Sequence, residues 1–291
     1  MLDENILKRL AFIRYLFNLA VEQSHRPEPM CSSAILTFHD SIELFLQLGS
    51  EHLCISKKSN NFMEYWQLFK DEKNLELGQK ISMRRLNNAR VGLKHHGTLP
   101  AKLAIDDFRI NVANFFDENT QLVFSVNFFE ISLIELVESE KVKNSLLEAE
   151  EELTKGEYEN SLDKVALAFR QLIDDYEDRK RDEFGRSPFF FGGSLTFVGS
   201  GYIGDTMVKM IPDEIIQSIE ALQNAVNILS LGLDYRRYAK FRLLTPIVMR
   251  FIGGKYSIQR INVKKEVTEE EIRFCINFVI ESAVLLQEFD Y

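Results

Sequence analysis

The feature of this chain that most limits its fold is a helical repeat of apolar residues through its first 116 positions. Apolar side chains recur there every three or four residues, the spacing that places them on one face of an α-helix. Breaks that contain proline, glycine or charged residues separate the periodic segments. The segments cover residues 5–23, 34–54, 62–69, 81–93 and 103–116. The pattern therefore predicts five helices that pack as a compact bundle.

The remainder of the chain is also predicted to be mostly helical. Two amphipathic helices follow residue 140, separated at Lys155-Gly156, because glycine commonly ends a helix. A helix is expected over 213–232, a short hairpin near 253–263, and a last helix from Glu269 to Phe289. Between the two halves, the apolar stretch TQLVFSVNFFEISLIELVE is predicted as a buried helix or a pair of helices.

These patterns together predict an all-α protein of two lobes. Residues 1–138 would form the helical bundle, and residues 139–291 a second helical lobe with a short Gly/Phe-rich loop or hairpin insertion. The polar residues Asn127, Glu130 and Glu135 interrupt the most apolar stretch before it reaches the roughly 20 apolar residues that a membrane span needs. We therefore expect no membrane partner.

Net charge and cysteine content narrow the class of protein. The chain has 35 Lys and Arg against 44 Asp and Glu, so most of its surface should repel nucleic acid, and an RNA partner would need a local basic patch. Its three cysteines lie far apart without a CxxC or Cys/His cluster, which argues against a disulfide framework or a zinc centre. The start MLDENILKRLAF has acids before its apolar run, unlike a secretory signal. We expect a cytoplasmic protein.

A GxGxxG motif at residues 199–204 resembles a dinucleotide fingerprint but lacks the required context. That mechanism needs the third glycine to open a helix that leads to a second parallel strand. Here Pro212 interrupts the next segment, and the periodicity that follows is helical. We interpret the motif as part of an irregular loop or small hairpin, near Phe189, Phe190, Phe191 and Phe197.

The segment NNARVGLKHHGTLP, residues 87–100, concentrates the candidates for chemistry. No acidic residue lies between Glu76 and Asp106, while six basic residues do. They are Lys80, Arg84, Arg85, Arg90, Lys94 and Lys102. Gly97 and Pro100 predict that a helix ends just after His96, so that Arg90, Lys94, His95 and His96 occupy its last two turns.

Helical geometry separates the candidate side chains. At about 100° per residue, His95 lies about 140° from Arg90, and His96 lies about 120° from it on the other side. Three ways to bring them to one phosphate remain open. The helix could fray at Gly97, the long arginine side chain could reach across, or a second copy of the helix could supply the missing group.

The arginine and histidine spacing resembles the HEPN superfamily, helical-bundle proteins of prokaryotic toxin-antitoxin and phage-defence systems. The family signature is an arginine followed after four to six residues by a histidine near a helix end. Arg90 with His95 fits the four-residue spacing, and Arg90 with His96 fits five. The pattern R-x-x-x-K-H-x-G and the earlier segment SAILTFHDSIELFLQLG are also similar to that family. The resemblance covers roughly residues 1–120.

The resemblance implies a metal-independent RNA endonuclease that needs no cofactor and works as a homodimer. In such a pair Arg90 would hold the scissile phosphate while His95, with His96 second, acts as acid or base during attack by a ribose 2′-OH. Arg84, Arg85 and Lys94 would bind the RNA backbone. An antitoxin or another defence-system protein would be a partner.

One departure from the family keeps a second function open. Active members often carry a polar residue directly after the arginine, whereas Val91 follows it here. The alternative is a non-catalytic HEPN-like scaffold or sensor that binds nucleotide, RNA or a protein partner.

Two further groups of residues are weaker candidates. Asp40 and Glu43 share a face of the second predicted helix with His39 nearby, and a carboxylate there could orient an imidazole at the Arg90 end. Far along the chain, Arg236 and Arg237 are interleaved with aromatic residues in LDYRRYAKFRLLTP, a composition suited to binding a single strand. Most acids and basic runs of this kind are simply solvated. Neither a Ser/His/Asp order nor a P-loop or HExxH motif occurs.

Overall fold

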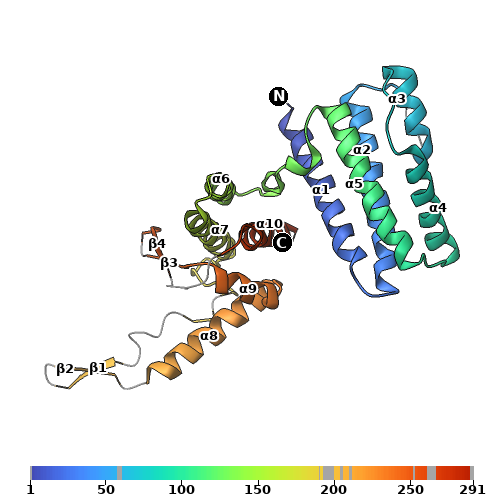
Figure 1. Ribbon diagram of the computed structural model, residues 1–291. Helices are drawn as coiled ribbons and strands as arrows, with labels where there is room; N and C mark the ends of the chain where they lie inside the picture. The colour runs from blue at the N-terminus through green and yellow to red at the C-terminus, as the bar shows by residue number, and fades with distance from the viewer. Residues whose placement is uncertain are drawn as a thin grey trace. The chain divides into compact units, whose positions relative to one another are not determined.

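The computed structural model describes residues 2–57, 61–189, 191–192, 200–203, 206–209, 212–251, 253–260 and 267–288. Within these ranges the chain forms ten α-helices and two short antiparallel hairpins (Figure 1). The contacts divide it into two compact units, Met1–Leu136 and Val137–Tyr291, called unit 1 and unit 2 below. The all-α prediction is confirmed for the described residues. No helix among them is long and apolar enough to cross a membrane.

Unit 1 contains the five helices that the apolar periodicity predicts. They are α1 (Glu4–Ser24), α2 (Ala34–His52), α3 (Tyr65–Lys73), α4 (Lys80–His96) and α5 (Lys102–Phe124). The four long helices lie side by side, and the short α3 follows α2 (Figure 1). Short 3-10 turns, η1 (Met30–Ser33) and η2 (Phe62–Glu64), precede α2 and α3.

The core of unit 1 is built on the apolar face of α2. Ala34, Ile35, Phe38, Ile42, Phe45 and Leu46 are fully buried. Phe45 contacts Phe115 and Phe116 of α5 edge to face, with ring centroids 5.4 and 5.6 Å apart, an arrangement that aromatic quadrupoles favour. These contacts hold α2 against α5.

The predicted helix or helix pair after residue 120 is wrong. Helix α5 continues to Phe124 and then stops because Ser125 adopts a left-handed backbone conformation, with φ of 59°. Two 3-10 turns follow, η3 (Phe128–Glu130) and η4 (Leu133–Leu136). The apolar side chains Phe128 and Ile134 are fully buried without forming a helical stripe. Apolar content alone did not distinguish short buried turns from a helix.

Unit 2 contains the other five helices, α6 (Glu140–Thr154), α7 (Tyr158–Arg179), α8 (Asp213–Ser230), α9 (Tyr235–Leu244) and α10 (Glu269–Glu288). The predicted break between the first two is confirmed, and Gly156 occupies it with φ of 79°. Phe169 of α7, Phe241 of α9 and Phe278 of α10 form an aromatic cluster with centroids 4.9 to 5.5 Å apart. This cluster forms part of the core of unit 2.

Both hairpins belong to unit 2. Strand β1 (Ser200–Ile203) pairs antiparallel with β2 (Thr206–Lys209), and β3 (Ile247–Arg250) pairs with β4 (Tyr256–Gln259). The central residues of the GxGxxG motif thus lie in an antiparallel strand instead of opening a helix, as the hairpin interpretation predicts. Its outer glycines at 199 and 204, and the end of the predicted hairpin at 261–263, lie outside the described residues.

Candidate functional site

The C-terminal end of α4 has the geometry that its sequence predicts. Gly97 adopts the left-handed conformation, with φ of 66° and ψ of 16°. Its N–H donates to the carbonyl of Leu93 at 3.2 Å, and the N–H of Thr98 donates to the carbonyl of Gly92 at 3.1 Å. These bonds satisfy two carbonyl groups of the last turn. The helix is therefore regular through His96.

The polar side chains at this end of α4 lie open to solvent. Arg90 is half-buried, while Lys94, His95 and His96 are exposed. None of these four side chains forms a hydrogen bond or ion pair with any described residue. Because the helix is regular, Arg90 and His95 keep their separation of about 140° around its axis. Fraying at the end of α4 therefore does not bring the arginine and a histidine together, which leaves the reach of the arginine side chain or a second copy of the helix.

The other three histidines have partners. Arg109 Nη1 lies 2.9 Å from Nε2 of His25. His52 stacks on Phe124 with ring centroids 5.0 Å apart. His39 is buried within α2. Among the described residues, His95 and His96 are thus the imidazoles that are both exposed and without a hydrogen bond or ion pair.

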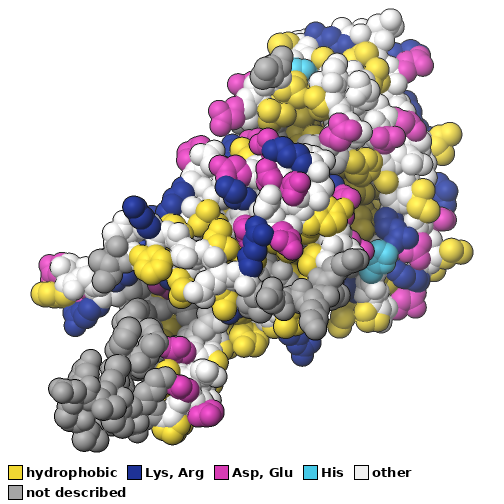
Figure 2. Space-filling model, turned by 60° about the vertical axis from the view of Figure 1, so that its left-hand side comes forward, with side chains coloured by type: hydrophobic (Ala, Val, Ile, Leu, Met, Phe, Trp, Pro, Cys, Tyr) yellow, Lys and Arg dark blue, Asp and Glu magenta, His cyan; other side chains and the backbone are white. Residues whose placement is uncertain are grey.

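The remaining basic residues of α4 are also unpaired. Arg84 and Arg85 are exposed and form no ion pair with a described residue. Elsewhere in unit 1 basic side chains pair with acids, for example Lys70 with Glu76 at 2.6 Å. On the face drawn in Figure 2, acidic and basic side chains are likewise interspersed. The unpaired cations of α4 form a local basic surface on a chain of net charge -9.

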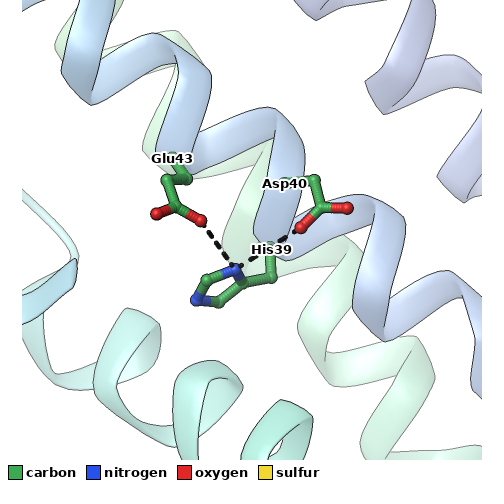
Figure 3. Close-up of side chains that lie close together, drawn as sticks. All are labelled: His39, Asp40 and Glu43. Atoms are coloured by element: carbon green, nitrogen blue, oxygen red, sulfur yellow. Dashed lines mark ion pairs between the residues drawn. The ribbon is translucent and has the colours of Figure 1, made fainter. Parts of the chain in front are cut away.

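A second polar cluster joins α2 to α4. His39 Nδ1 lies 3.6 Å from Glu43 Oε2 and 3.8 Å from Asp40 Oδ1, and both carboxylates point at this nitrogen (Figure 3). His39 Nε2 lies 3.0 Å from Asn87 Oδ1 on α4. No ion pair joins Asp40 or Glu43 to His95 or His96 among the described residues. The imidazole that the carboxylates face is therefore that of His39 on their own helix.

Sequence reasoning missed Asn87 as a member of this cluster. Its position three residues before Arg90 places it on the same side of α4. However, no local pattern indicates that His39, 48 residues away, packs against it. Only the packing of α2 on α4 supplies this contact.

The basic residues proposed in unit 2 differ from each other in their surroundings. Arg236 is exposed and makes no hydrogen bond or ion pair with a described residue. Arg237 forms an ion pair with Glu281 of α10 and lies over the ring of Phe274 at 6.0 Å. Lys240 covers the same ring at 4.2 Å. Arg237 would have to exchange Glu281 for a phosphate in order to bind RNA.

Unit 2 also contains a cavity that sequence reasoning did not find. It has a volume of about 940 Å³ and is lined by α7, α8, α9 and β3, with Arg170, Glu177, Asn224, Asn227 and Arg242 among its polar residues. Burial raises the pKa of Glu177 above its usual range, while the Asn227 amide donates to it at 2.6 Å and opposes the shift. Most of the charged side chains that line the cavity form ion pairs within unit 2, as Arg170 does with Asp174 at 2.6 Å.

Comparison of the chain with family models, with curated proteins and with solved structures gives no match.

Alanine substitutions at two glycines near the end of α4 are expected to change the stability of the protein in opposite directions. A methyl group at Gly92 would meet Thr98 Cβ at 3.8 Å, an ordinary contact, so Gly92→Ala should stabilise the helix by about 0.5–1 kcal/mol. Gly97 has open space but a positive φ, so Gly97→Ala should destabilise by roughly 1 kcal/mol. Urea titration of the full chain measures both. Equal effects of the same sign would contradict the cap geometry.

Proposed function

We propose that this protein is a metal-independent RNA endonuclease of a toxin or phage-defence type that acts in the cytoplasm. The observation that carries the proposal is the set of unpaired cations and imidazoles at the end of α4. Arg90 holds the scissile phosphate, His95 acts as the general acid or base, and His96 is the second candidate for that role. Arg84, Arg85 and Lys94 bind neighbouring phosphates, and Arg236 is a separate RNA contact on unit 2. An antitoxin or another defence-system protein restrains the activity.

The side chains at this site suffice for transesterification of RNA. A base removes the proton of a ribose 2′-OH, and the 2′-oxygen attacks the adjacent phosphorus. The bond to the 5′-oxygen breaks as an acid protonates that oxygen, which leaves a 2′,3′-cyclic phosphate and a free 5′-OH. A guanidinium binds two phosphate oxygens at once and stabilises the charge that develops on them. Imidazole can supply both the base and the acid.

A second copy of unit 1 would bring one arginine beside the other copy's histidine. Exposed apolar side chains beyond the end of α4 support such a contact, because Leu99, Leu103 and Ile110 are 57%, 75% and 56% exposed. Leu103 and Ile110 are two helical turns apart and share one face of α5. Two-fold pairs are the commonest oligomers and bury the same patch on both copies. We therefore propose a homodimer through this face.

A non-catalytic scaffold or sensor is the second candidate, favoured by Val91. This valine follows Arg90 on α4 and is 37% exposed, where active relatives of the proposed class often carry a polar group. In that case the basic surface of α4 would bind RNA, nucleotide or an acidic protein partner without cleaving it. Its RNA affinity would still fall with salt, because phosphate contacts release counterions.

Cleavage in the presence of EDTA is expected to distinguish these functions. The purified full chain should cut single-stranded or transfer RNA at the same rate, within about twofold, with and without excess EDTA, since no step of general acid-base transesterification uses a metal. An all-deoxy strand of the same sequence should stay intact because it lacks the attacking hydroxyl. Lack of cleavage over a panel of RNAs, together with salt-sensitive binding that is lost when Arg84, Arg85 and Arg90 are reversed to Glu, would establish the alternative.

A further inference from the structure

Nδ1 of His39 in unit 1 is a buried nitrogen with no hydrogen-bond partner among the described residues. The His39 side chain is only 3% exposed, and its Nδ1 makes no hydrogen bond. The ring cannot turn away, because it stacks on Phe62 with centroids 4.3 Å apart and its other nitrogen contacts Asn87. Buried polar atoms of a folded chain usually have a hydrogen-bond partner, so this orphan nitrogen calls for a physical explanation.

The contact with Asn87 determines which atom of His39 carries the proton. Asn87 Oδ1 is an acceptor, so Nε2, 3.0 Å away, donates to it as N–H. A neutral imidazole has only one N–H, which leaves Nδ1 as a lone pair. That lone pair faces Asp40 Oδ1 and Glu43 Oε2 (Figure 3). With this tautomer of the neutral ring, three electron-rich atoms point toward one another.

The distances among these atoms suit a shared cation better than hydrogen bonds. Separations of 3.6 and 3.8 Å from Nδ1 to the carboxylate oxygens are too long for hydrogen bonds. Two metal-ligand bonds of about 2.1 Å that meet at roughly 110–120° span about 3.4–3.6 Å. All three ligand atoms lie within 4.8 Å of one another. Small side-chain rotations of the two acids would close the remaining difference.

We propose that His39, Asp40 and Glu43 form a binding site for a divalent first-row transition metal ion, of which Zn²⁺ is the representative. One imidazole and two carboxylates are typical ligands for such ions. Asp40 and Glu43 have side chains that are 61% and 40% exposed, so the ion reaches the site from solvent and keeps water in its open positions. The cysteine pattern predicted no zinc centre, and it gives no signal for this site because none of the three ligands is a cysteine.

The surroundings of His39 match those of a metal ligand. A coordinating histidine generally donates its second N–H to a carboxylate or carbonyl oxygen, which fixes the ring and its tautomer, and the Asn87 amide oxygen fills that role. His39 and Glu43 lie one helical turn apart, so α2 holds two of the ligands in place before an ion binds. Metal binding would thus stabilise the contact between α2 and α4, and it does not depend on the proposed RNA cleavage.

Zn²⁺ binding by the full chain tests the site. Isothermal titration should find one Zn²⁺ ion bound at this cluster in each chain. Asp40→Asn and Glu43→Gln preserve the shape of the side chains but remove a carboxylate, and each should lower the affinity for Zn²⁺ at least tenfold. Asn87→Ala should weaken it about 10- to 100-fold through the second N–H of His39. The matched control Asp117→Asn removes an exposed carboxylate of α5 that has no partner among the described residues, and it should change the affinity less than twofold.

Exposed His95 and His96 could also attract Zn²⁺, so the titration is repeated in a His95→Ala/His96→Ala background, where the binding should persist. The proposal is overturned if this background binds no Zn²⁺ below millimolar concentration, or if Asp40→Asn and Glu43→Gln bind as tightly as Asp117→Asn. None of these outcomes alters the expected RNA cleavage in EDTA, so the two proposals fail separately.

Discussion

Replacing Arg90 or His95 by alanine is expected to abolish RNA cleavage without unfolding the protein. Removing one donor to the developing charge costs about 10²–10³ in rate, and removing a general acid or base costs about 10²–10⁴. Neither side chain has a hydrogen bond or ion pair to a described residue. Changes at such positions usually alter the free energy of unfolding by less than about 0.5 kcal/mol. Cleavage rate and melting temperature of the same samples measure both effects.

Two matched variants make this comparison specific. Arg26→Ala removes an exposed arginine of unit 1 without a partner among the described residues, and His25→Ala removes a histidine whose ring contacts Arg109. Both should cut RNA at nearly the parental rate. If the Arg90 and His95 variants also cut as fast as the parent, the assignment of the site is wrong. A fall in melting temperature of many degrees would instead assign these residues to the fold.

Local rules were enough to predict most of the helices. Periodic apolar residues located α1, α2, α4 and α5, since each helix must bury one face. Gly97 marked the end of α4, because a glycine readily adopts the left-handed backbone conformation that ends the helix there. The stretch after residue 120 escaped the same rules. Its buried apolar side chains belong to short 3-10 turns, which are too short to show a helical repeat in the sequence.

Contacts between distant segments were beyond prediction from one sequence. The sequence placed Asp40 and Glu43 on one face of α2, but it could not show that Asn87 of another helix orients His39 between them. Similarly, the basic composition around Arg237 indicated an RNA surface, whereas Glu281 of α10 pairs with this arginine. In both cases the neighbour is set by the packing of helices, which side-chain spacing along one helix does not encode.

Mixing two inactive variants is expected to restore cleavage if the site is composite. Helix α4 is regular through His96, so Arg90 and His95 of one copy lie about 140° apart around its axis. In the composite site that we propose, a phosphate takes its arginine from one copy and its histidine from the other. A dimer of one Arg90→Ala chain with one His95→Ala chain then holds one intact site and one site that lacks both groups. Random exchange gives half such dimers, and so about a quarter of the parental activity.

The most direct measurement of the composite site is the RNA cleavage rate of an equimolar mixture of Arg90→Ala and His95→Ala chains after subunit exchange. The proposal predicts about a quarter of the parental rate, against almost none for either variant alone. Adding Leu103→Asp to both chains should prevent the recovery, because it places charges in the proposed apolar contact of α5. Parental chains that cut RNA, with a mixture no more active than its separate components, would contradict the composite site.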